Sequence, residues 1–173
     1  MCQVTFNVDC KLGSWGLKYH NVLSTLLCLC VAGATIFLGG LASLQNECYD
    51  DGSYAGNTDG LAGVNGFSAQ AHTCKKIFRY YWFIAAFEFV VAFFGIYAVC
   101  LKSKFASLKG SLLGLFVVAT LLFIATSDAF LGLIEVPLFQ SETLRDRSKT
   151  AVAGAIITAT LNAAVVFVSG YDA

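Results

Sequence analysis

The chain has 173 residues, of which 57% are hydrophobic and 13% are charged, and its mean hydropathy is +0.71. This composition is typical of a membrane protein with several spans rather than of a water-soluble domain. The 11 basic and 11 acidic residues balance, and no strongly basic segment stands out. Nucleic acid is therefore excluded as an expected partner.

The first 19 residues alternate apolar and polar side chains, and Trp15 and Tyr19 lie close to two lysines. Aromatic and basic side chains of this kind gather at the headgroup level of a bilayer. We expect an interfacial segment here, with a loosely ordered terminus as the alternative. Residues 22–43 follow as the first predicted span, and their small residues would let a neighbouring helix pack closely.

Residues 44–76 are polar and rich in glycine, and they form the largest loop expected outside the membrane. Cys48 lies near one end of this loop and Cys74 near the other, each close to a predicted membrane boundary. A disulfide between them would staple the loop across the first two spans, and it would need an oxidising compartment. Two free thiols are the alternative, because spacing alone does not prove a bridge.

Three further apolar runs predict spans at residues 77–100, 111–134 and 151–169. Each must be helical, because every backbone polar group in lipid needs a partner within its own segment. The sequence therefore predicts an all-α bundle of four transmembrane helices, forming a single domain over residues 1–173. Membrane lipids are expected to surround it.

The ends of the later spans carry additional signals. Phe78, Tyr80, Tyr81 and Trp82 open the second span and predict an interfacial aromatic belt. The residues before the fourth span carry charges of both signs, and an N-cap is expected at Ser148 or Thr150. The two faces of the membrane would carry nearly equal numbers of lysines and arginines, so the positive-inside rule does not decide the topology. We use the cysteine pair to decide it. This pair places residues 44–76 outside and both termini in the cytoplasm.

Polar side chains recur at two depths in the predicted spans. Counted from the outer boundary, Glu88 and Asn162 fall in one layer near the middle of the membrane. Asp128, Thr35 and Thr158 fall in a second layer, roughly 7 Å nearer the outside at 1.5 Å per residue. Carboxylates at this depth should face protein or a cavity rather than lipid. The two layers form either a polar path or a buried structural network.

Small and aromatic residues recur at helical spacing in the last three spans. Ala151, Ala155, Ala159 and Ala163 form one ladder, and Gly110 with Gly114 forms a GxxxG pair. Phenylalanines make two stripes, one at positions 83, 87 and 94 and the other at 116, 123 and 130. Core or lipid-facing packing is the simplest interpretation of the stripes. An apolar constriction formed by Phe87, Phe116 and Phe123 is the alternative.

These faces offer more packing surface than one small bundle consumes, so we expect a homo-oligomer and favour a trimer. Lipid that covers the surplus is the alternative. Catalysis is not expected. His20 and His72 are assigned to opposite faces, Cys28 and Cys30 do not form a CxxC pair, and no phosphate-binding glycine motif occurs. We therefore predict no enzyme activity, no metal and no cofactor.

Three stretches carry a resemblance to a known family: MCQVTFNVDCKLGSWGLKYHNVL at the start, NECYDDGSYAGNTDG in the outer loop and FIATSDAFLGL in the third span. With these, the whole chain resembles the low-CO2-inducible plasma-membrane protein of green algae. The resemblance implies a channel or transporter for CO2 or bicarbonate in the plasma membrane, serving a carbon-concentrating mechanism. A claudin- or MARVEL-like scaffold without transport is the rival, although GLASLQNEC lacks the tryptophan of the claudin pattern GLW-x-x-C.

The residues themselves favour CO2 over bicarbonate as the substrate. An anion in a membrane path would need fixed cations or helix N-termini facing it. The mid-membrane groups are instead two carboxylic side chains, Glu88 and Asp128. CO2 requires only a narrow apolar route.

Overall fold

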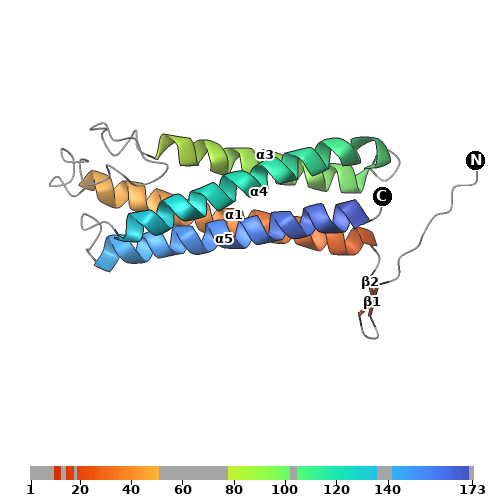
Figure 1. Ribbon diagram of the computed structural model, residues 1–173, viewed down its shortest axis with the longest axis horizontal. Helices are drawn as coiled ribbons and strands as arrows, with labels where there is room; N and C mark the ends of the chain where they lie inside the picture. Colours follow the sequence, from red (N-terminus) through yellow and green to blue (C-terminus); the bar gives the residue numbers. More distant parts are fainter. Residues whose placement is uncertain are drawn as a thin grey trace, which may run out of the picture.

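The computed structural model describes residues 10–12, 15–17, 19–50, 78–101, 105–135 and 142–171. Within these ranges, four long helices run side by side in an up-and-down bundle (Figure 1). They are α1 (Tyr19–Asp50), α3 (Arg79–Cys100), α4 (Phe105–Glu135) and α5 (Glu142–Tyr171). Each contains a stretch that is long and apolar enough to cross a membrane. The predicted four-helix membrane bundle is therefore confirmed.

A short hairpin precedes the bundle, and the sequence did not predict it. The strands β1 (Cys10–Leu12) and β2 (Trp15–Leu17) pair antiparallel, with Leu12 opposite Trp15. The hairpin lies beyond the end of the bundle where α1 begins and α5 ends (Figure 1).

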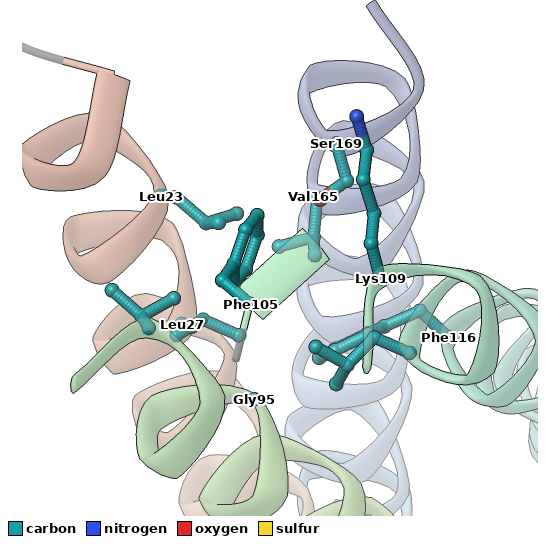
Figure 2. Close-up of a pocket in the computed structure, with 10 residues that line it drawn as sticks. Leu23, Leu27, Gly95, Phe105, Lys109, Phe116, Val165 and Ser169 are labelled. Carbon is teal, nitrogen blue, oxygen red and sulfur yellow. The ribbon is translucent and has the colours of Figure 1, made fainter. Parts of the chain in front are cut away.

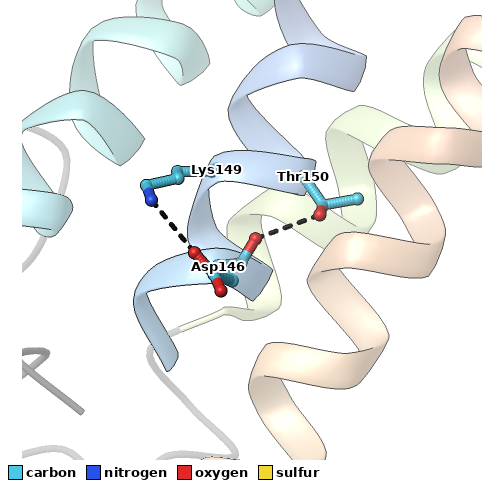
Figure 3. Close-up of polar contacts among 3 residues, drawn as sticks. All are labelled: Asp146, Lys149 and Thr150. Atoms are coloured by element: carbon cyan, nitrogen blue, oxygen red, sulfur yellow. Dashed lines mark hydrogen bonds and ion pairs between the residues drawn. The ribbon is translucent and has the colours of Figure 1, made fainter. Parts of the chain in front are cut away.

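The helices extend further than the predicted spans at several ends. α1 continues to Asp50, α4 begins at Phe105 and α5 begins at Glu142. The N-cap expected at Ser148 or Thr150 is therefore wrong. Figure 3 shows Thr150 Oγ1 donating to the Asp146 carbonyl at 3.0 Å, one turn back within α5. Apolarity marks where a helix lies in lipid, whereas a polar turn can continue the same helix into water.

The four helices form a ring in which each packs on two neighbours. α1 packs against α3 and α5, and α4 packs against the same two helices. α3 and α5 therefore face each other across the centre of the bundle, as do α1 and α4. Any side chain that joins one of these diagonal pairs crosses the bundle axis.

The closest helix pair is α1 with α5, where glycines let the two backbones meet. A Cβ at Gly40 would lie 2.6 Å from the Ala151 nitrogen, and one at Gly33 would lie 2.8 Å from the Thr158 Oγ1. Ala151, Ala155 and Ala159 of the predicted alanine ladder are buried, and only Ala163 is exposed. Most of the alanine ladder therefore packs against other helices of the same chain.

Candidate functional site on the bundle axis

A hydrogen bond between Glu88 of α3 and Asn162 of α5 crosses the bundle axis. Asn162 Nδ2 donates to Glu88 Oε2 at 2.8 Å, and both residues are 0% exposed. The two residues that the sequence assigned to one layer are therefore in direct contact. We call this pair the polar crossbar.

The polar crossbar leaves two buried oxygens without a hydrogen-bond partner in the described part of the chain, Glu88 Oε1 and Asn162 Oδ1. Each such atom costs about 1–3 kcal/mol when it is deprived of a partner. The Cys30 thiol of α1 is also buried, and it interacts electrostatically with Glu88. Sequence reasoning missed Cys30, because it asked only whether this residue could pair with Cys28.

A cluster of aromatic rings closes the axis between the polar crossbar and the end where α3 begins. The Phe37 ring of α1 meets the Phe123 ring of α4 with centroids 5.3 Å apart, and these helices form the other diagonal. Phe130 lies 6.0 Å from Phe37 and 4.7 Å from Tyr81, again between ring centroids. All four side chains are buried. We call them the aromatic plug.

An apolar pocket lies on the other side of the polar crossbar, toward the end where α1 begins (Figure 2). Leu27, Gly95 and Phe116 form part of its lining, and Gly95 lies two turns from Glu88 along α3. The space open to the centre of a water-sized molecule is about 10 Å³, near the minimum that holds one water. Its remaining lining residues are Leu23, Val99, Phe105, Lys109, Leu112, Val165 and Ser169.

The residues of the predicted apolar constriction are only partly on the axis. Phe116 lines the pocket and Phe123 belongs to the aromatic plug, and both are buried. Phe87 is only partly buried, at the edge of the core. Phe37 completes the ring contacts, and its position four residues after Gly33 on α1 was the signal that could have revealed it.

The second predicted layer of polar groups does not form. Thr158 is buried, but its hydroxyl donates to the Gly154 carbonyl within α5 at 2.8 Å. Thr35 and Asp128 lie on the outside of the bundle. The expectation that Asp128 faces the interior is therefore wrong for the single chain. Counting residues gives depth, but it does not give the side of the helix on which a residue lies.

The end of the bundle at which α1 ends and α3 begins carries two contacts between helices that the sequence did not reveal. Trp82 Nε1 donates to Gln45 Oε1, which joins α3 to α1. Arg147 Nη1 donates to the Ser43 carbonyl at 2.9 Å, which joins α5 to α1. In the predicted aromatic belt, Tyr80 and Trp82 are exposed whereas Phe78 and Tyr81 are buried in the core. Of the predicted Cys48–Cys74 pair, Cys48 falls within α1, whereas Cys74 lies outside the described residues, so the disulfide stays a prediction.

The bundle, the polar crossbar and the aromatic plug define a four-span membrane protein with a closed central axis. Among solved structures, the chain is similar to the crystal structure of the Chlamydomonas reinhardtii LCI1 channel, with a TM-score of 0.77. The two chains are 19% identical, and the match covers 88% of this chain and 95% of that chain. The resemblance seen in the sequence is thus confirmed at the level of the fold. No protein-family model and no curated protein matches the sequence.

Proposed function

We propose that this protein is a plasma-membrane channel for inorganic carbon, that it conducts CO2 in preference to bicarbonate, and that it feeds a carbon-concentrating mechanism. The shared fold with a solved channel supports the assignment to channels. The chemistry of the bundle axis supports the choice of substrate. The proposed route runs from the apolar pocket past the polar crossbar and through the aromatic plug.

The observation that carries this proposal is the lack of basic side chains beyond the pocket on the proposed route. Among the described residues, Lys109 is the one basic side chain of the pocket lining, and the polar crossbar and aromatic plug contain none. Past Lys109, bicarbonate would have to cross the crossbar and the plug without a fixed positive charge, which costs several kcal/mol. CO2 has no net charge, so the apolar lining of the pocket suits it.

The axis is closed in this conformation, so conduction requires side chains to move. The polar crossbar blocks one diagonal and the Phe37–Phe123 contact blocks the other. Both barriers are made by side chains, which change rotamer far faster than whole helices move. A channel of this design opens transiently while the bundle stays intact.

We propose further that the protein forms a homo-oligomer, a trimer in the favoured case, through the outward face of α4. This helix is the least covered of the four: 22% of its apolar window is buried, against 33% for α1 and 44% for α3 and α5. Gly110, Gly114, Leu121 and Asp128 all lie on its exposed side. A second copy would shield the Asp128 carboxylate, whose exposure to lipid costs roughly 2.5–3.5 kcal/mol on insertion scales.

The proposed orientation places both termini in the cytoplasm, with the segment between α1 and α3 outside the cell. Figure 1 shows the two described chain ends at the same end of the bundle, as an even number of spans requires. The proposed Cys48–Cys74 disulfide would form on the outer side, where oxidation is permitted.

Proteoliposomes that contain the purified protein provide the test of the proposed function. Carbonic anhydrase trapped inside converts entering CO2 to acid, which a trapped dye reports in stopped-flow mixing. At a single pH, freshly mixed solutions that have not yet equilibrated offer either mainly CO2 or mainly bicarbonate outside the vesicles. A CO2 channel gives a flux over empty vesicles with the CO2 solution and none with the bicarbonate solution. A flux that follows bicarbonate instead would reverse the choice of substrate. A flux equal to that of empty vesicles with both solutions would favour the scaffold alternative.

A further inference from the structure

The two residues of the polar crossbar are fully buried, but some of their polar atoms have no hydrogen-bond partner. Glu88 and Asn162 are both 0% exposed, yet Glu88 Oε1 and Asn162 Oδ1 lack partners in the described part of the chain. Both atoms accept hydrogen bonds when Glu88 is ionised, so neither can satisfy the other. One proton on Glu88 Oε1 changes this, because a carboxylic acid donates where a carboxylate can only accept.

We propose that Glu88 is a proton-binding site that latches the bundle axis shut. In the latched state the acid O–H donates to Asn162 Oδ1 while Asn162 Nδ2 donates to Glu88 Oε2. The pair then forms a ring closed by two hydrogen bonds, with no net charge and no orphaned oxygen. The bond that exists at 2.8 Å is one half of this ring.

Loss of the proton has a defined consequence at this position. The ionised carboxylate would need further donors, because among the described residues Asn162 Nδ2 is its donor and Glu88 Oε1 has no partner. Cys30 from α1 interacts with Glu88, and Asn162 from α5 donates to it. On α4, the buried Phe116, Ala119 and Phe123 are apolar. The buried hydroxyls of Thr126 and Ser127 already donate to backbone carbonyls within α4. The only acid on that stretch of α4, Asp128, is exposed on the opposite side. Water entering from the apolar pocket would supply the missing hydrogen bonds and separate the crossbar.

The proton therefore sets whether the polar crossbar is dry and closed or wet and separated. The ratio of ionised to protonated Glu88 rises about tenfold per pH unit, so the crossbar separates as pH rises, and the Phe37–Phe123 contact is then the remaining barrier on the axis. The geometry of the crossbar alone supports two parts of this proposal, that Glu88 binds a proton and that water enters the crossbar when the proton is lost. Only the link to CO2 flux rests on the proposed function.

Two readouts test the latch without any transport measurement. Infrared difference spectra between the wild type and Glu88→Gln, both in vesicles, report the C=O stretch of a protonated Glu88. We expect this band at low pH, its loss as pH rises, and its retention in Asp128→Asn, which removes an exposed carboxylate instead. The second readout is labelling of Cys30 by a water-soluble thiol reagent, quantified by mass spectrometry of the labelled peptide.

Glu88→Gln is expected to keep the axis latched at every pH, because the introduced amide can donate to Asn162 Oδ1 and accept from Asn162 Nδ2. Thiols react faster at high pH in any protein, so the informative quantity is the Cys30 labelling rate of the wild type divided by that of Glu88→Gln. We expect this ratio to be near one at low pH and to rise in step with the ionised fraction of Glu88, reaching a plateau once the band has gone.

The absence of a Glu88 band at every pH would overturn the proton site, and a labelling ratio that stays near one after the band has gone would overturn the latch. If Glu88→Gln fails to fold, Asn162→Leu takes its place. This variant removes the hydrogen-bond partner of Glu88, so the C=O band of protonated Glu88 should shift. A band at the wild-type position would overturn the pairing of Glu88 with Asn162. CO2 flux in the same vesicles separates the two proposals. A flux equal to that of empty vesicles, with band and labelling as expected, would leave the latch standing and remove the channel.

Discussion

Gly154 of α5 lies directly on the backbone of Phe37 of α1, so that a Cβ at position 154 would stand 2.6 Å from the Phe37 Cα. Backbone atoms in two packed helices cannot move aside as a side chain can. This contact therefore fixes the distance between α1 and α5, and it holds the Phe37 ring in the aromatic plug.

Gly154→Ala should destabilise the protein by about 1–3 kcal/mol, because overpacking forces the two helices apart. Gly39→Ala is the matched control on α1, since a Cβ there meets nothing within 4 Å. Removal of this helical glycine should gain up to about 1 kcal/mol from helix propensity. Thermal unfolding in detergent should thus move in opposite directions for the two variants. A downward shift of equal size in both would contradict the close approach at Gly154.

Phe123→Ala removes a fully buried ring of the aromatic plug. We expect a loss of about 3–5 kcal/mol of stability, as for other buried aromatic residues, together with a higher CO2 flux. Phe83→Ala is the control, because this side chain on α3 is 59% exposed. It should change neither quantity appreciably. Equal thermal shifts for the two variants would show that the plug is not part of the core.

The helices could be predicted from sequence because run length and composition decide whether a segment spans lipid. Depth was equally accessible: Glu88 and Asn162 were assigned to one layer, and they meet there. The side on which a residue lies was not accessible, as Asp128 demonstrates. In water, hydrophobic periodicity separates the buried from the exposed face. In lipid both faces are apolar, so α4 gives no such signal, and only the folded bundle reveals which face is free.

The outward face of α4 should meet another copy of the chain. Leu121→Cys, on a residue that is 61% exposed, should form a disulfide between copies when the membrane preparation is oxidised. Val90→Cys on α3 is the control, at 67% exposed. Only the first should shift to the mass of a dimer on a non-reducing gel. Mass measurement in mild detergent completes the test, and a persistent monomer at every protein concentration would rule out the oligomer.

A disulfide should join Cys48, in the last turn of α1, to Cys74 in the segment between α1 and α3. Alkylation of intact cells, followed by digestion without reductant, should yield one cross-linked peptide pair, because the outer side of the membrane is oxidising. Reduction before alkylation serves as the control and should release both peptides. Finding both cysteines alkylated in unreduced cells would refute the disulfide and weaken the topology that relies on it.

The most direct test of the central claim, that CO2 crosses through the axis of the single bundle, is the flux through a protein whose apolar pocket has been filled. A Cβ at Gly95 would lie 2.8 Å from Leu27 Cδ2 and 3.3 Å from Phe116 Cε2, two side chains that line the pocket. Gly95→Leu should therefore close the remaining space, at a cost in stability from overpacking. Gly39→Leu adds the same side chain on the outside of α1. We predict that CO2 flux in proteoliposomes falls to that of empty vesicles for Gly95→Leu and stays at the wild-type value for Gly39→Leu. A folded Gly95→Leu protein with wild-type flux would contradict a route through the bundle axis.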